Sequence, residues 1–94
     1  MVWLVVSVNG VFYLGDSLDY VKVQNSDGKG KKRFARLTNC RMVDRRSPNP
    51  STYPSCMVCT RYIIFAEEVK LNREMDYKEL KKWFSKFPES ERIK

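Results

Sequence analysis

Residues 1–14 constrain the fold of this chain most strongly, because they carry the pattern of a β-hairpin. Residues 2–8 form a run rich in β-branched side chains, and residues 11–14 form a shorter apolar run. Asn9 and Gly10 separate the two runs, and this dipeptide suits the left-handed conformations of a type I′ turn. A tight hairpin joins antiparallel strands, and no crossover helix follows that would connect parallel ones. The start of the chain therefore predicts an antiparallel sheet.

Two further strands are predicted, over residues 18–23 and 33–43, with a mobile turn at residues 25–30 between them. The later strand carries basic side chains on both faces. It is therefore expected at the edge of the sheet or in a small curled barrel, and not at the centre of a flat sheet. Strict alternation divides its residues between two faces: Phe34, Thr38, Cys40 and Met42, with Arg36, on one, and Arg33, Ala35, Leu37, Asn39, Arg41 and Val43 on the other.

Residues 44–54 contain three prolines among Ser, Asn and Thr residues, which favours a surface loop. A fifth strand is predicted from about residue 56 to residue 66. Its apolar pattern extends through Val69 and Leu71 after a break at Glu67 and Glu68.

A helix is predicted over about residues 76–87. Asp76 is the N-cap, Glu79 completes a capping box, and Met75 and Leu80 occupy the positions of a hydrophobic staple. Pro88 closes the helix. The apolar arc of the helix, which is expected to cover the core of the sheet, is formed by Tyr77, Leu80, Trp83, Phe84 and Phe87, and the opposite side by Lys78, Lys81, Lys82 and Lys86.

These elements predict an α+β fold: a twisted antiparallel or small barrel-like sheet of four to six strands with one C-terminal amphipathic helix. The 94 residues fit one domain, 1–94, in which residues 1–72 are β-rich, the helix covers about 76–87 and a short tail covers 88–94. The apolar run at residues 2–6 is too short for a signal sequence or a membrane span. We therefore expect a cytoplasmic protein with no membrane partner.

Three cysteines, Cys40, Cys56 and Cys59, cannot all pair within one chain, and the sequence leaves open whether they have a redox role. A structural zinc site needs four ligands, and the chain has no histidine. Cys56 and Cys59 lie on a predicted strand, where positions three apart face opposite sides. We therefore expect no metal and no cofactor.

The chain offers little that could support catalysis. Without histidine it lacks the usual general base, so we do not expect an enzyme. Gly28 and Gly30 are one residue apart in a turn between strands, whereas a phosphate-binding loop needs four residues between its glycines and a following helix.

Positive charge is concentrated in one stretch, where eight of the nine charged residues between Gly28 and Arg46 are basic. A block of like charge repels itself, which indicates a polyanion or an acidic protein surface as partner. Phe34 and Tyr53 are nearby candidates for stacking on bases. The candidate binding residues are Lys29, Lys31, Lys32, Arg33, Arg36, Arg41, Arg45, Arg46 and Arg61.

Two functions fit this pattern. The first is a small basic protein that binds DNA or RNA through phosphate contacts, largely without sequence preference. The alternative is a protein-interaction module or inhibitor, of the kind common in phages and mobile elements. Such a module would dock its basic surface on an acidic protein, for example in a nucleic-acid-processing complex. Charge alone does not separate the two.

Overall fold

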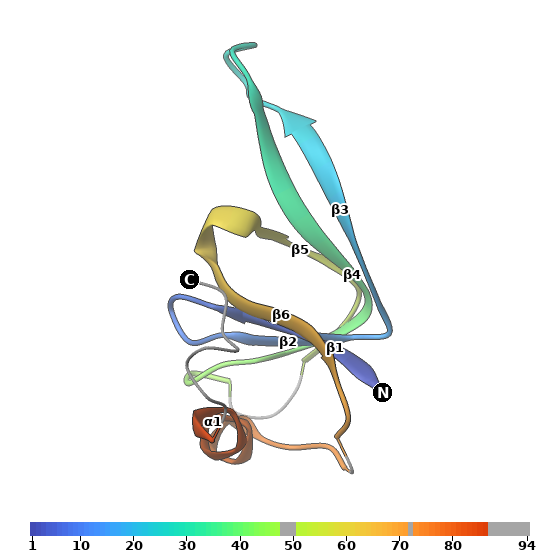
Figure 1. Ribbon diagram of the computed structural model, residues 1–94, viewed down its shortest axis with the longest axis vertical. Helices are drawn as coiled ribbons and strands as arrows, with labels where there is room; N and C mark the ends of the chain where they lie inside the picture. Colours follow the sequence, from blue (N-terminus) through green and yellow to red (C-terminus); the bar gives the residue numbers. More distant parts are fainter. Residues whose placement is uncertain (48–50, 72, 87–94) are drawn as a thin grey trace.

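The computed structural model describes residues 1–47, 51–71 and 73–86. Six antiparallel strands form a curled half-barrel sheet, and one helix follows them in the chain (Figure 1). The predicted α+β fold class is confirmed. The elements are β1 (Val2–Ser7), β2 (Phe12–Gly15), β3 (Ser17–Gln24), β4 (Lys31–Val43), β5 (Ser51–Cys59), the 3-10 turn η1 (Thr60–Tyr62), β6 (Ile63–Val69) and α1 (Tyr77–Ser85).

The predicted first hairpin is present as β1 and β2, but the type I′ turn was wrong. A type I′ turn needs positive φ at both central residues, and of this dipeptide only Gly10 has it, at 85°. The amide of Ser7 donates to the Val11 carbonyl at 3.0 Å, and the Ser7 hydroxyl accepts from the Val11 amide at 3.2 Å. Since Ser7 and Val11 close the turn, the chain reverses over the three residues 8–10, and the Ser7 hydroxyl also contacts the Asn9 side chain.

The strand β4 lies inside the sheet. It pairs with β5 along one edge and with β3 and β2, placed end to end, along the other. Of the two positions expected for it, the edge strand is wrong, and the strand inside a curled, barrel-like sheet is confirmed. Its pairing with β5 begins only at Phe34, so Lys31, Lys32 and Arg33 extend past that neighbour into solvent.

The single strand predicted after the proline-rich segment is two strands. The turn η1 separates β5 from β6, which pairs with β1 at the opposite end of the sheet. β5 also begins at Ser51, inside the segment expected to be a loop. Pro54 is tolerated there because, among the residues that the structure describes, β5 pairs on one edge only, so the missing N–H needs no second neighbour.

The ladder that β2 and β3 form with β4 turns sharply at one point, which we call the corner and which consists of Gly15, Asp16 and Asn39. The Asp16 amide donates to the Thr38 carbonyl at 2.9 Å, and the Asn39 side-chain amide donates to the Asp16 carboxylate at 2.9 Å. Asn39 has φ 47°, a left-handed conformation that Asn adopts more readily than most residues.

The ladder buries a different face on each side of the corner. On one side of it Phe12, Leu14 and Val43 pack in the core beneath the helix, whereas on the other Leu37 packs in the hollow of the curl. The alternation predicted for residues 33–43 therefore fails at Asn39. Cys40, assigned to the face of Phe34, is instead fully buried in the same cluster as Leu37.

Two hydrophobic clusters result, one on each side of β1. The helix-side cluster contains Leu4, Val6, Phe12, Leu14, Val43, Phe65, Val69, Leu80 and Phe84. The concave cluster contains Val5, Ala35, Leu37, Cys40, Val58 and Ile63. Burial on both faces explains why the start of the chain reads as a continuous apolar run.

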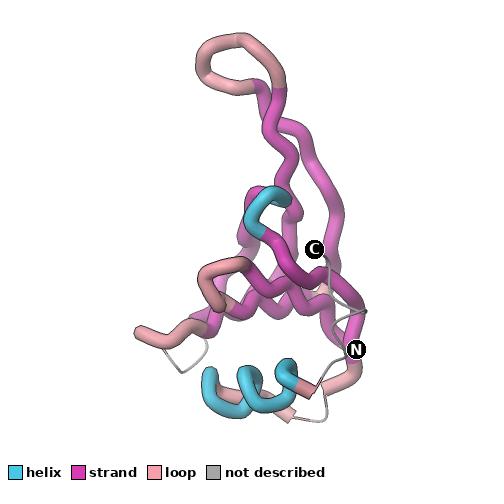
Figure 2. The backbone as a smooth tube through the Cα atoms, turned by 60° about the vertical axis from the view of Figure 1, so that its left-hand side comes forward, coloured by secondary structure: helices cyan, strands magenta, loops and turns pink. Residues whose placement is uncertain are grey.

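The helix α1 covers one side of the sheet (Figure 2). Its predicted start is confirmed: the Asp76 carboxylate accepts from the Glu79 amide at 2.9 Å, and the Glu79 carboxylate accepts from the Asp76 amide at 3.3 Å. Phe87 and Pro88, expected to end the helix, lie outside the described residues. Within the described residues, no helix is long and apolar enough to cross a bilayer.

The packing of α1 gives a stability prediction. Phe84 is 7 % exposed and makes edge-to-face contacts with Phe12 and Phe65, at ring-centroid distances of 6.0 and 5.1 Å. We expect Phe84→Ala to lower the free energy of unfolding by about 3–5 kcal/mol, because it leaves a cavity. Urea denaturation measures the change, and Lys78→Ala, on the exposed face, is the control. Unchanged stability of Phe84→Ala would mean that the helix is not docked.

The corner gives a second prediction. A Cβ atom at Gly15 would lie 2.9 Å from the Leu37 Cβ and 3.0 Å from the Thr38 carbonyl oxygen. Gly15→Ala should therefore cost about 1–3 kcal/mol, because it overpacks a site that includes backbone. The comparison variant is Asn39→Gly, which keeps φ 47° accessible, loses an exposed hydrogen bond and adds the entropic cost of a glycine, without overpacking the corner. If Gly15→Ala melts at the wild-type temperature, the corner is not tightly packed.

Candidate functional site

The nine predicted binding residues do not form one continuous patch. Lys29, Lys31, Lys32 and Arg33 lie at the β3–β4 turn, while Arg45 and Arg46 follow the other end of β4. This strand has 13 residues, which is about 40 Å along its length. The structure therefore brings four of the nine together and separates them from the two arginines at the far end.

The first group belongs to a projecting hairpin, which we call the arm and define as residues 22–33. Its three residue pairs are Lys22 with Arg33, Val23 with Lys32, and Gln24 with Lys31. The pairing of β5 with β4 ends at Phe34, so the arm is a two-stranded ribbon that extends beyond the body (Figures 1 and 2).

All the basic residues of the arm are exposed. The arm carries five basic residues and the single acid Asp27, a net charge of +4. Lys22 was missed by the sequence analysis because it precedes the basic stretch. The pairing of two strands across a turn places it directly opposite Arg33. The predicted hairpin register could have revealed it.

The turn at the end of the arm is held by its own hydrogen bonds. The Asn25 amide donates to the Gly30 carbonyl at 2.9 Å, and the Lys29 amide donates to the Asp27 carboxylate at 2.8 Å. Gly28 and Gly30 have φ values of 75° and 103°. As expected, these glycines form a turn between strands.

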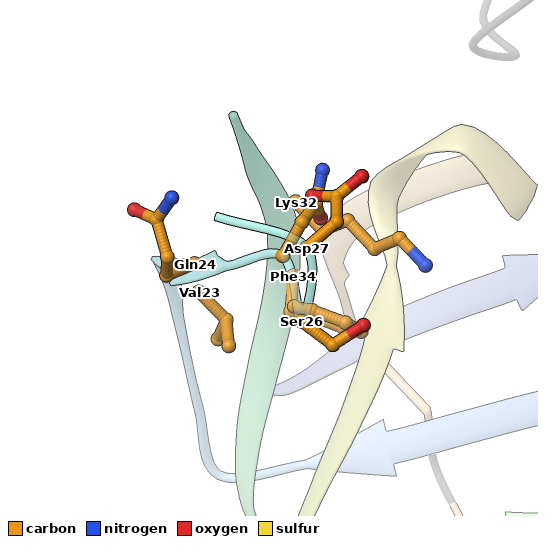
Figure 3. A pocket seen from close by; sticks show the side chains of 7 residues that line it. Val23, Gln24, Ser26, Asp27, Lys32 and Phe34 are labelled. Atoms are coloured by element: carbon orange, nitrogen blue, oxygen red, sulfur yellow. The ribbon is translucent and has the colours of Figure 1, made fainter. Parts of the chain in front are cut away.

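The two faces of the arm differ in chemistry. One face presents Lys22, Gln24, Lys31 and Arg33, and we call this set the polar face. The other face holds Val23, Lys32 and Phe34 with the turn residues Ser26 and Asp27 beside them, around a cavity of about 310 Å³ that Gln24 and Asn25 also border (Figure 3). The Asp27 carboxylate therefore lies with the apolar face, and the polar face carries three of the five cations.

Arg36 and Arg41 are engaged in ion pairs. Arg36 forms two hydrogen bonds with the Asp19 carboxylate, at 3.1 and 2.5 Å, and this contact raises the pKa of its guanidinium. Arg41 pairs with Glu74 at 2.5 Å. Both arginines are therefore partly neutralised, which makes them weaker candidates for a phosphate contact than the cations of the arm.

The remaining predicted cations lie around a second region. Arg45 and Arg46 border a cavity of about 440 Å³ together with Asn9. Asn9 also borders an apolar cavity of about 470 Å³, which we call the seam groove. The seam groove lies between β5 and the β1–β2 loop and is lined by Ser7, Val8, Asn9, Tyr13, Met57, Val58, Cys59 and Tyr62. Arg61 lies over the Tyr62 ring, 5.4 Å from its centroid.

The two aromatic residues proposed to stack on bases lie apart. Phe34 pairs with Cys59 and Tyr53 pairs with Cys40, six positions further along β4, or about 20 Å. Phe34 is also half-buried on the apolar face of the arm. The structure therefore shows no shared stacking surface of Phe34 and Tyr53. Tyr20, which the sequence analysis did not select, is 47 % exposed and has the Arg33 guanidinium 4.8 Å from its ring centroid.

Cys40 lies in the concave cluster, where its thiol donates to the Arg41 carbonyl at 3.7 Å and Cys56 packs against the cluster. Burial, followed by the contacts with Cys56, raises the pKa of the Cys40 thiol well above its usual range. Cys59, three positions after Cys56, instead lines the seam groove. In the described stretches of the chain, no group of three or more His, Cys, Asp or Glu residues could hold a metal ion.

Comparisons of the chain with protein-family models, with curated proteins and with solved structures found no match. Any functional inference therefore depends on the geometry and charge described above. The arm and the seam groove are the two surface features that carry such an inference.

The thiols give a third prediction. Cys40 should resist iodoacetamide at pH 8 in the native protein, because a raised thiol pKa leaves little thiolate at that pH and the side chain is buried. Cys59 should react under the same conditions, and all three cysteines should react in urea. Mass spectrometry of the digested protein measures each site. Labelling of Cys40 at the rate of Cys59 would show that the concave cluster opens readily.

Proposed function

We propose that this protein binds nucleic acid through the arm. The observation that carries the proposal is that five cations lie exposed on a ribbon that projects beyond the rest of the sheet. None of the ion pairs found among the described residues involves these five cations. A projecting set of cations without an acidic partner is suited to following a phosphate backbone, since each contact releases counterions condensed on the nucleic acid.

The arrangement of charges on the arm supports a polyanionic partner. Lys22 and Arg33 stand directly opposite each other, and like charges in such a cross-strand pair destabilise a sheet. Lys31 lies two residues before Arg33 on the same face and adds to the repulsion. A bound phosphate backbone would relieve it. The free protein thus retains repulsion among these like charges, and binding of a polyanion removes it.

The proposed activity is binding without catalysis. Lys and Arg side chains donate hydrogen bonds to phosphate oxygens and position the protein, but they carry no sequence information through these contacts. The arm continues β3 and β4 of the body, and the Thr60 hydroxyl contacts its base. We therefore propose a small DNA- or RNA-binding protein in which phosphate contacts provide most of the affinity.

The seam groove supports a second candidate function, a protein-interaction module. Val8, Met57 and Tyr62 line it and are 59 %, 47 % and 50 % exposed, so apolar side chains gather there in contact with water. Exposed apolar patches of this kind often mark protein-binding sites. Arg61 beside Tyr62 would favour an acidic partner, in line with the alternative drawn from the sequence.

The arm gives a fourth prediction. If about four of its cations contact phosphates, the logarithm of the association constant should fall against the logarithm of salt concentration with a slope of about −3 to −4. Changing Lys31, Lys32 or Arg33 singly to Ala should reduce the magnitude of the slope by about one. Fluorescence anisotropy of a labelled oligonucleotide at several salt concentrations measures it.

The double variant Lys78→Ala/Lys82→Ala is the matched control, because these lysines are also exposed but lie on α1. It should keep the wild-type slope. Equal losses from the arm and the helix would indicate diffuse attraction with no defined site. Absence of binding at low salt would contradict nucleic-acid binding and favour the protein-interaction module.

A further inference from the structure

We infer that the arm enters the major groove of double-stranded DNA as a two-stranded ribbon, with its polar face toward the base edges. This inference rests on the proposed nucleic-acid binding and specifies its ligand. The major groove of B-form DNA is wide enough for an α-helix or a two-stranded β-ribbon. The arm is such a ribbon, because no third strand pairs with residues 22–24 or 31–33 in the described chain.

The length of the arm matches the groove. Its three residue pairs extend about 10 Å at a rise of about 3.4 Å per residue, and the turn over residues 25–30 adds to this. The major groove is about 12 Å wide and admits a two-stranded ribbon along its floor. The free portion of the arm is therefore long enough to lay its three residue pairs along the groove, while the end of β5 and the start of η1 stay at its base.

The polar face carries side chains that can contact base edges. Gln24 can form a two-point contact with adenine, and either Arg33 or Lys31 can donate to the O6 and N7 atoms of guanine, which leaves four cations of the arm for the bordering phosphates. Lys22 supplies a third cation on the same face. The apolar face, by contrast, carries Phe34, a single cation, Lys32, and the Asp27 carboxylate, and a phosphate backbone would repel that carboxylate. The polar face is therefore the one turned toward the groove floor.

The position of η1 places a further cation at the base of the arm. The Thr60 hydroxyl donates to the Arg33 carbonyl at 3.2 Å, which holds η1 against the point where the arm leaves the body. Arg61, the next residue, is exposed. When the arm lies in the groove, Arg61 is at the height of the backbone that borders it and can contact a phosphate.

The aromatic side chains favour a duplex over a single strand. Single-strand binders use a row of exposed aromatic rings on which successive bases stack. Here Phe34 and Tyr53 are far apart along β4, and Phe34 is on the apolar face. Tyr20 adjoins the polar face but is occupied by the Arg33 guanidinium. The arm therefore offers several cations but no row of exposed aromatic rings on which successive bases could stack.

The same geometry separates DNA from RNA. The major groove of an A-form RNA duplex is deep and narrow, so a ribbon with its side chains cannot enter it. The RNA minor groove is wide but shallow and displays 2′-hydroxyl groups, so it offers the polar face a different set of partners. We therefore expect discrimination between DNA and RNA duplexes of the same sequence, whereas attraction by charge alone would treat them nearly alike.

The experiment compares four labelled probes of one mixed sequence: a duplex of about 16 base pairs of DNA, the matching RNA duplex and each DNA strand alone. Fluorescence anisotropy at a single moderate salt concentration measures the affinities. We expect the DNA duplex to bind about tenfold more tightly than the RNA duplex and than either single strand, because only the DNA duplex admits the arm.

Dimethyl sulfate footprinting then locates the arm on the DNA duplex, since it methylates guanine N7 in the major groove and adenine N3 in the minor groove. Bound protein should protect guanine N7 and leave adenine N3 reactive. The double variant Gln24→Ala/Arg33→Ala should lose this protection, whereas Lys78→Ala/Lys82→Ala should keep it. Thermal melting shows whether each variant is folded, and Lys31→Ala serves as a second arm variant if the double variant is not.

The outcomes distinguish major-groove binding from the more general proposal that the arm binds nucleic acid. Equal affinity for all four probes, tighter binding of RNA or of a single strand, or protection of adenine N3 alone would each overturn major-groove binding. Nucleic-acid binding itself would stand in those cases. Absence of binding to every probe at low salt would overturn both and leave the seam groove as the remaining candidate site.

Discussion

The close approach of two strands at Gly15 is the contact on which the rest of this structure depends. Because glycine has no Cβ, β2 can approach Leu37 and the Thr38 carbonyl closely enough for the ladder to turn while its register continues without a break. Asn39 absorbs the same turn on β4 by adopting a left-handed conformation. The close approach at Gly15 and the left-handed conformation of Asn39 thus let the ladder turn without a loop.

The turn of the ladder explains how the described part of this short chain builds two apolar layers with one helix. Before the corner the ladder packs beneath α1, and after it the ladder folds over the other face of β1. The direction of the arm follows from the same geometry, because β3 and the first half of β4 leave the body along the line that the corner sets (Figure 1). Core packing and the position of the candidate binding surface are therefore coupled.

The sequence was most informative where local chemistry decides the structure. The capping box of Asp76 and Glu79 and the apolar runs beside Asn9 and Gly10 specify their elements within a few residues. It was least informative where distant segments meet. The inward position of β4, the burial of Cys40 and the separation of Phe34 from Tyr53 all depend on the corner, and a single glycine in a sequence does not show what approaches it. The arm was predicted in part: its basic stretch is evident in the sequence, but Lys22 joins it only through the pairing of β3 with β4.

The unpaired outer edge of the arm has a consequence for solubility. A two-stranded ribbon exposes backbone N–H and C=O groups that could pair with the same strand of another molecule and start aggregation. Lysine side chains along such an edge oppose this, since two copies that approach edge to edge bring like charges together. The cations of the arm would thus also keep the chains apart at high concentration. Any chemical modification that neutralises them, such as lysine acetylation, would therefore promote self-association as well as weaken the attraction to a polyanion.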